Sequence, residues 1–213
     1  MTTVRATSFE LVDDDGRVRA RLPAGPDDEV ALDFADGDGA VRVTLGIGPD
    51  GGALLALRDQ AGKTRALVKA TEAGPSVDLI DAEGRQRVSL LEGAGLPAGL
   101  AVWDAEGRHR AVVAHGPTPE RDASVELFDG EGHYRVGLGV WPDGSTGVEL
   151  LDDRGNVRGR LGERPDRTVC VEEWDRDGQL RARFGDRPDG SFTVDFWDRD
   201  GTYRHGLGSQ PRT

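Results

Sequence analysis

Apolar residues in this chain recur in pairs two positions apart, and short polar segments that contain glycine separate the pairs. Apolar residues at alternate positions are typical of a β-strand with one apolar face, and glycine-bearing segments between them are typical of turns. Glycine or proline also interrupts the sequence too often for long helices. Residues 63–73 have some apolar spacing of the helical kind but fit the same strand pattern. The pattern predicts an all-β protein.

The polar segments share a motif: an aspartate, a glycine three residues later and an arginine three residues after that. Its nine copies begin at Asp13, Asp36, Asp59, Asp81, Asp104, Asp129, Asp152, Asp175 and Asp198. Such regular spacing is typical of repeat proteins whose units stack on their neighbours. We expect one repeat domain over residues 1–213, with hairpin units at 8–29, 30–52, 53–74, 75–97, 98–122, 123–145, 146–168, 169–191 and 192–213.

Four apolar columns flank the motif, at positions −4, −2, +7 and +9 counted from its aspartate. Of these thirty-six residues all but Gly159, Glu173 and His205 are apolar. A two-residue turn at the Asp-Gly or Glu-Gly step places −2 opposite +7 and −4 opposite +9, so that all four columns share one face. A type I turn with a left-handed glycine suits the motif better but shifts one strand by a residue. We favour the two-residue turn, because burial contributes about 1.5–3 kcal/mol for each large side chain.

The predicted fold is a series of nine tandem β-hairpins of about 23 residues each, in an elongated or superhelical array. The alternatives are a β-propeller with two hairpins in each blade and a homo-oligomeric β-prism in which several chains share a core. A single layer of hairpins buries only one face, and this favours self-association.

Second turns join successive hairpins. The strongest signals are the Pro-Asp-Gly segments 49–51, 142–144 and 188–190, with variants at 26–28 and 165–167. The joints at 71–74, 93–97 and 116–120 differ, and we expect ordinary loop variation there.

The residue just before the motif aspartate is aromatic in four units, and in the favoured register it lies across from the motif arginine. Arginine stacks on aromatic rings, so the sequence predicts a structural ladder. The alternative is a ligand platform, for example for glycans, formed by Trp103, Phe128, Trp174, Trp197, Arg110, Arg135, Arg181 and Arg204.

Calcium is the main metal hypothesis, because four turns read Asp-x-Asp-Gly and calcium binds six to eight oxygen atoms. The candidate ligands are Asp13, Asp15, Asp36, Asp38, Asp175, Asp177, Asp198 and Asp200. No turn has a distal glutamate at EF-hand spacing, and an arginine follows each turn closely. We therefore expect no cofactor, with calcium as the alternative.

Catalytic chemistry has little support, because the four histidines His109, His115, His133 and His205 occupy different repeat positions. Glu131 and His133 lie at the same hairpin tip and could form an acid–base pair, but this position is solvated and does not exclude water. Cys170 is the single cysteine, so internal disulfides and thiolate metal clusters are excluded, and we expect it to pack as a small residue. We expect that the protein is not an enzyme.

Acidic residues outnumber basic ones by 39 to 27, which argues against a nucleic-acid partner. No apolar run approaches the roughly 20 residues that span a bilayer, and residues 1–10 lack the apolar core of a secretion signal. The expected location is cytoplasmic, with an extracellular one open. The expected partner is the protein itself, in a homo-oligomer, or another protein.

The segments WDAEGRH, WDRDGQL and WDRDGTY resemble the YD-type repeats of Rhs and teneurin shells, whose core is roughly Tyr-Asp-x-x-Gly-Arg. The resemblance implies long spiralling sheets of hairpins, and the aromatic hairpins of choline-binding modules are more distantly similar. No tyrosine precedes a motif aspartate here, and no functional residues carry over. Two functions follow as hypotheses: a structural or protein-interaction repeat protein, or a glycan- or calcium-binding module.

Overall fold

The computed structural model describes residues 3, 5–23, 30–48, 50–93, 96–115 and 123–209. These residues form eighteen β-strands and no helix, which confirms the all-β fold class. None of the described residues belongs to a helix long and apolar enough to cross a membrane. The chain divides into two compact units, Met1–Gly107 and Arg108–Thr213. The assignment of a single repeat domain stays a prediction.

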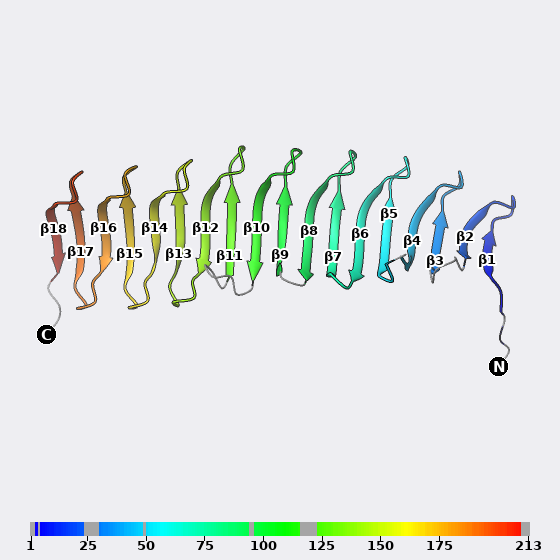
Figure 1. Cartoon of the computed structure of the whole chain (residues 1–213), viewed down its shortest axis with the longest axis horizontal. Helices are drawn as coiled ribbons and strands as arrows, with labels where there is room; N and C mark the ends of the chain where they lie inside the picture. The colour runs from blue at the N-terminus through cyan, green and yellow to red at the C-terminus, as the bar shows by residue number, and fades with distance from the viewer. Residues whose placement is uncertain are drawn as a thin grey trace. The chain divides into compact units, whose positions relative to one another are not determined.

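In the first unit each strand pairs antiparallel with the strand that precedes it in the chain (Figure 1). Its strands are β1 (Ser8–Val12), β2 (Val18–Pro23), β3 (Val30–Ala35), β4 (Val41–Ile47), β5 (Ala53–Arg58), β6 (Thr64–Thr71), β7 (Gly74–Ile80), β8 (Gln86–Gly93) and β9 (Leu96–Trp103). Strand β6 covers most of residues 63–73, so the choice of strand over helix there is confirmed.

The second unit repeats this arrangement of antiparallel neighbours. Its strands are β10 (His109–His115), β11 (Ala123–Phe128), β12 (Tyr134–Val140), β13 (Thr146–Leu151), β14 (Val157–Glu163), β15 (Val169–Trp174), β16 (Leu180–Asp186), β17 (Phe192–Trp197) and β18 (Tyr203–Ser209). Among the described residues of each unit, strands pair only with their neighbours in sequence. This confirms a tandem hairpin array in preference to separate propeller blades.

The predicted register is confirmed, but the predicted two-residue turn is wrong. In the hairpin of β11 and β12, Leu127 pairs with Val136 and Val125 pairs with Leu138, as expected for −2 with +7 and −4 with +9. The same pairs recur in the other hairpins whose two strands lie within one unit. The four apolar columns therefore share one face.

The turn itself is the type I turn with a left-handed glycine. The Gly132 N–H donates to the Asp129 carbonyl (3.1 Å), and Gly132 has a φ of 89°. A bulge between Leu127 and Phe128 absorbs the one-residue shift, so the register is restored beyond it. The hairpin thus combines the type I turn with apolar columns on a single face, because the motif arginine, Arg135, is the extra residue of the bulge.

The second turns at 141–145, 164–168 and 187–191 have the same geometry, whereas the joint at 71–74 is a two-residue turn in which Thr71 pairs with Gly74. In the segment 141–145, the Gly144 N–H donates to the Trp141 carbonyl (2.8 Å), and Asp143 Oδ1 accepts from the Ser145 N–H (2.9 Å). Arg167 occupies the glycine position of its turn, with a φ of 69°. The predicted turn at 26–28 and the joint at 116–120 lie outside the described residues.

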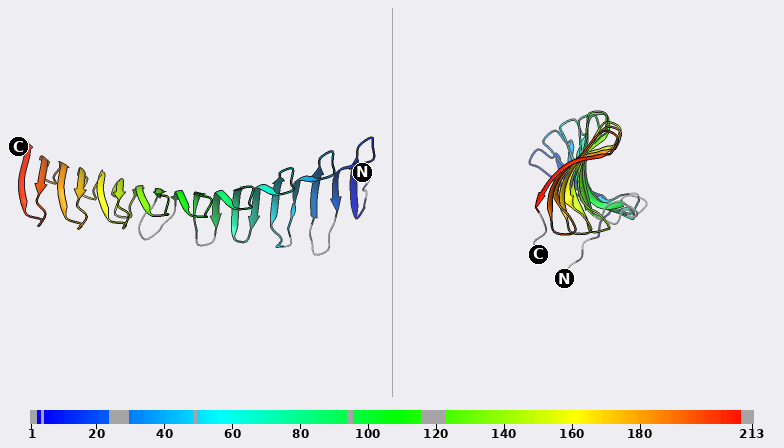
Figure 2. Two further views of the ribbon diagram at one scale, coloured as in Figure 1. Left: turned by 90° about the horizontal axis from the view of Figure 1, so that it is seen from above. Right: turned by 90° about the vertical axis from the view of Figure 1, so that its left-hand side faces the viewer.

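Each unit is a single layer of strands (Figure 2). The face that carries the four apolar columns is open to solvent: Leu127 is 44% exposed and Leu138 is 53% exposed. The sequence pattern suggests a buried face here, but within each unit no described residue covers it. The opposite face holds the most buried side chains, including Ser89, Glu172, Asp195 and Cys170. Cys170 packs there as a small buried residue, as predicted.

Candidate functional site

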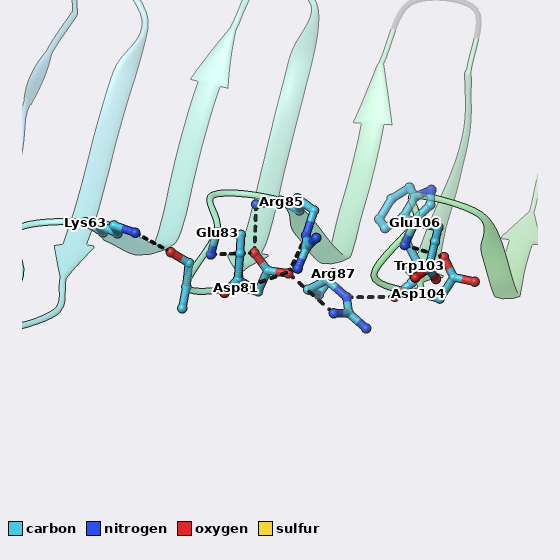
Figure 3. A network of polar contacts seen from close by, with 9 residues as sticks. Lys63, Asp81, Glu83, Arg85, Arg87, Trp103, Asp104 and Glu106 are labelled. Atoms are coloured by element: carbon cyan, nitrogen blue, oxygen red, sulfur yellow. Dashed lines mark hydrogen bonds and ion pairs between the residues drawn. The ribbon is translucent and has the colours of Figure 1, made fainter.

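The motif aspartate organises each hairpin turn. In the turn that begins at Asp81, Oδ1 accepts hydrogen bonds from the N–H groups of Glu83 (3.0 Å) and Arg85 (2.9 Å) (Figure 3). Its Oδ2 faces the guanidinium groups of Arg85 (2.9 Å) and Arg87 (3.4 Å). Partial burial raises the pKa of Asp81, but the bonds from Arg85 and Glu83 outweigh this and lower the pKa from 3.8 to about 2. Asp81 therefore stays ionised and holds the turn.

The motif arginine links its own turn to the next hairpin. Arg87 Nε donates to the carbonyl oxygen of Trp103 (2.9 Å), one hairpin further along, while Lys63 Nζ reaches the carbonyl of Ala82 (2.6 Å) from the hairpin before (Figure 3). The same arginine-to-carbonyl bond joins Arg19 to Ala35, Arg135 to Leu151, Arg158 to Trp174 and Arg181 to Trp197. The motif is thus a connection between repeats.

The predicted pairing of the aromatic residue with the motif arginine is wrong. Phe128 pairs with Tyr134, Trp174 with Leu180 and Trp197 with Tyr203, because the arginine is the extra residue of the bulge. The rings of Phe128 and Trp197 pack on their paired tyrosines, with 5.9 Å between the ring centroids in each pair.

The eight candidate platform residues are engaged in these contacts. Arg110 contacts the carbonyl of Asp129, and Arg204 contacts the carboxylate of Asp198. A ligand-binding role for Trp103, Phe128, Trp174, Trp197, Arg110, Arg135, Arg181 and Arg204 stays a prediction.

The candidate calcium ligands comprise two kinds of residue. Asp13, Asp36, Asp175 and Asp198 hold turns, with Oδ1 bonded to backbone N–H groups and Oδ2 near the motif arginine. Asp15, Asp38, Asp177 and Asp200 are exposed at the tips. A calcium ion would compete with an arginine for the first group, so no cation site stands out, and calcium binding stays a prediction.

Asp129, Glu131 and His133 form a cluster in which three ligating atoms lie within 4.8 Å of one another. Asp129 Oδ2 already contacts His133 Nδ1 (3.3 Å) and the Arg135 guanidinium (3.1 Å). Glu131 and His133 are exposed at the hairpin tip. The cluster therefore belongs to the turn network, and it forms no enclosed site for acid–base chemistry.

A row of alternating charges crosses the buried face of the second unit. Glu149, Arg160, Glu172, Arg183 and Asp195 pair in that order on successive strands.

Two acidic members of this row, Asp195 and Glu172, are held by arginines of the second turns. Arg187 donates to both oxygens of Asp195 (2.9 and 2.8 Å), and Arg164 pairs with Glu172. Burial raises the pKa of Asp195, but Arg187 and Thr193 outweigh it and lower the pKa. This row is not among the features predicted from the sequence, although the residues at positions −3 and +8 alternate in sign.

The open apolar face is the most extensive candidate functional surface. Each unit presents twelve large side chains there that are more than a third exposed. Those of the first unit are Phe9, Leu11, Leu22, Val30, Phe34, Leu45, Ile47, Leu57, Val68, Val77, Leu79 and Leu90. Those of the second unit are Val113, Leu127, Leu138, Val140, Leu150, Leu161, Val169, Val171, Phe184, Phe192, Phe196 and Leu207.

Comparison with known proteins gives little further information. No family model matches the chain, and no curated protein matches it. Among solved structures, the chain is similar to the crystal structure of TcdB2-TccC3, with 13% sequence identity and a TM-score of 0.24. The match covers 95% of this chain and 14% of that one, so this chain spans about a seventh of that chain's length. A similarity this weak carries no conclusion about function.

Proposed function

We propose that this chain is a non-enzymatic structural repeat protein that self-associates through its open apolar face. A repeat protein with a role in protein interactions is the broad class that the hairpin array fits. Monomeric proteins rarely expose apolar patches beyond about 300–600 Å². A face with twelve large apolar side chains in each unit exceeds that range. This face is the observation that carries the proposal.

The distribution of charge supports the same conclusion. The four apolar columns contain only Glu173 and His205 as polar exceptions, although the chain as a whole has a net charge of −12. Burial of an uncharged face stabilises an assembly, because apolar surface gains about 25 cal/mol for each Å² removed from water. A partner for such a face is itself apolar.

Size-exclusion chromatography with light scattering tests the proposal. The wild type should have a mass that is a multiple of 22.8 kDa, and the variant Leu138→Lys/Leu161→Lys should approach 22.8 kDa. The control Asn156→Lys/Gln179→Lys adds the same charge at turn positions where Lys63 occurs naturally, so it should keep the wild-type mass. A monomeric wild type at all concentrations would contradict the proposal.

A further inference from the structure

The apolar face of the second unit has a checkerboard of large and small side chains. In the row formed by positions −2 and +7, the order over β11 to β14 is Leu127, Val136, Leu150 and Gly159. In the row formed by positions −4 and +9, the order over the same strands is Val125, Leu138, Val148 and Leu161. A large residue in one row thus lies beside a smaller one in the other row on every strand.

Burial follows this checkerboard. The large residues of the pattern are each 44–53% exposed: Leu127, Leu138, Leu150 and Leu161. The smaller residues between them are less exposed: Val125, Val136, Val148 and Gly159. The face therefore consists of projections and depressions in alternation. Sheets that pack face to face lie about 10 Å apart and interdigitate their inner side chains, so such a surface requires a partner with the same period.

We infer that the occupant of this face is the same face of a second copy of the chain. This inference rests on the proposed function and adds the mode of association. Consider a two-fold axis that lies between the two copies and runs perpendicular to the strands, parallel to the sheet. This axis places each hairpin over the same hairpin of the other copy. It also places the row of positions −2 and +7 over the row of positions −4 and +9. Leu150 of one copy then meets Val148 of the other, and Leu161 meets Gly159. Over β11 to β14 every projection of the two rows faces a depression, and the contact closes with two copies.

The available area is sufficient for a stable dimer. With about half of each side chain exposed, the twelve large apolar residues of the second unit present on the order of 1,000 Å². A specific interface needs about 800 Å² from each partner. One unit alone therefore meets the requirement.

Glu173 is the one charged residue at a projecting position of the checkerboard. It pairs with Gly159 on one side and with Ala182 on the other, and it is exposed. In the face-to-face dimer its carboxylate faces Val171 of the second copy, and transfer of such a group from water to apolar surroundings is unfavourable. Glu173 therefore limits the affinity of the dimer, and an apolar residue at this position completes the pattern.

Cross-linking with a short bismaleimide tests the arrangement in a Cys170→Ala background. Leu161→Cys should give a covalent dimer, because the two copies of this residue lie near each other across the interface. Arg160→Cys, its neighbour on the opposite face of β14, should not. If the protein associates but Leu161→Cys fails to cross-link, the face-to-face inference is overturned and the proposed self-association stands. If the wild type is monomeric, both are overturned.

A substitution at Glu173 tests the interface by strengthening it. Glu173→Leu should lower the dissociation constant of the dimer about tenfold or more. The control Glu131→Leu adds the same side chain at an exposed hairpin tip and should leave the constant unchanged. An unchanged constant for Glu173→Leu, or an equal gain for both variants, would contradict the inference.

Discussion

Arg135 donates a hydrogen bond from Nε to the carbonyl oxygen of Leu151 (2.9 Å), and its Nη1 lies 3.1 Å from Asp129 Oδ2. One side chain thus joins the turn of its own hairpin to the backbone of the next. Leu151 is sixteen residues further along the chain. Since the bond recurs between other hairpins, the motif arginine aligns successive repeats.

Loss of this link should destabilise the protein. Arg135→Ala removes a charged donor from a carbonyl, which costs about 1–2 kcal/mol in the free energy of unfolding. Arg135→Lys keeps the charge but not the planar group that reaches both acceptors, so we expect an intermediate loss. Urea titrations measure the change. The control Arg176→Ala, at an exposed turn position, should stay within about 0.5 kcal/mol of the wild type. Equal losses for Arg135→Ala and Arg176→Ala would argue against the link.

Acid should destabilise the fold through the turn aspartates. Partial burial raises the pKa of Asp129, but hydrogen bonds from His133, Arg135 and Glu131 outweigh it, and the pKa falls from 3.8 to about 2. Because the pKa of the folded state lies below that of the unfolded state, this stabilisation is complete above about pH 4. It is lost as the pH falls towards 2.

Thermal melts from pH 6 to pH 2 measure this dependence. The variant Asp81→Asn/Asp129→Asn should melt lower at pH 6 and lose less stability below pH 4 than the wild type, because two of the titrating groups are gone. An Asp15→Asn control, at an exposed tip, should follow the wild-type profile. Parallel profiles for the double variant and the wild type would contradict the assignment.

Arg167 should be replaceable with a gain in stability. Its φ of 69° lies in the left-handed region, and Gly51, Gly144 and Gly190 hold the same turn position in other units. Arg167→Gly relieves strain of about 1 kcal/mol and loses only an exposed ion pair with Glu163. The melting temperature should rise by a few degrees. The control Arg176→Gly, at a turn position without positive φ, should lower the melting temperature. A lower melting temperature for Arg167→Gly would show that Arg167 is not strained.

Two glycines of β14 should respond differently to alanine. A Cβ on Gly162 would lie 2.1 Å from the Thr146 carbonyl oxygen, whereas a Cβ on Gly159 would have its nearest contact at 3.5 Å, with Leu150 Cδ1. Gly162→Ala should cost about 2–3 kcal/mol in the free energy of unfolding, and Gly159→Ala should be neutral or stabilising. Denaturant midpoints compare the two. Similar midpoints would show that β13 and β14 do not approach so closely.

The hairpins and their register follow from the sequence because alternate apolar residues allow few arrangements. Pairing of Leu127 with Val136 is the solution that gathers the apolar columns on one face, and the structure has it. The type of turn is harder to predict from the sequence. A bulge at Arg135 allows the favoured register and the type I turn to occur together, so the register does not determine the turn. The partner of Arg135 leaves no trace in the sequence, because a backbone carbonyl is present at every residue.

The sequence pattern also does not predict whether the apolar face is covered. Columns that contain Leu138 and Leu161 look the same whether a second layer covers them or not. The structure shows one layer in each unit and leaves these side chains half exposed. The buried Asp195 is held by Arg187 of the second turn before it, and the sequence pattern does not show that this turn arginine reaches the strand.

Thiol labelling at position 161 tests most directly whether the apolar face is open in the chain and covered in the assembly. In a Cys170→Ala background, Leu161→Cys should react slowly with a maleimide in concentrated protein and rapidly after dilution. Gln179→Cys, at a turn, should react at the same rate in both. Protection of Leu161→Cys at every dilution would mean that the chain itself buries this face, and equal rapid labelling would mean that no copy covers it. Either result would contradict the account.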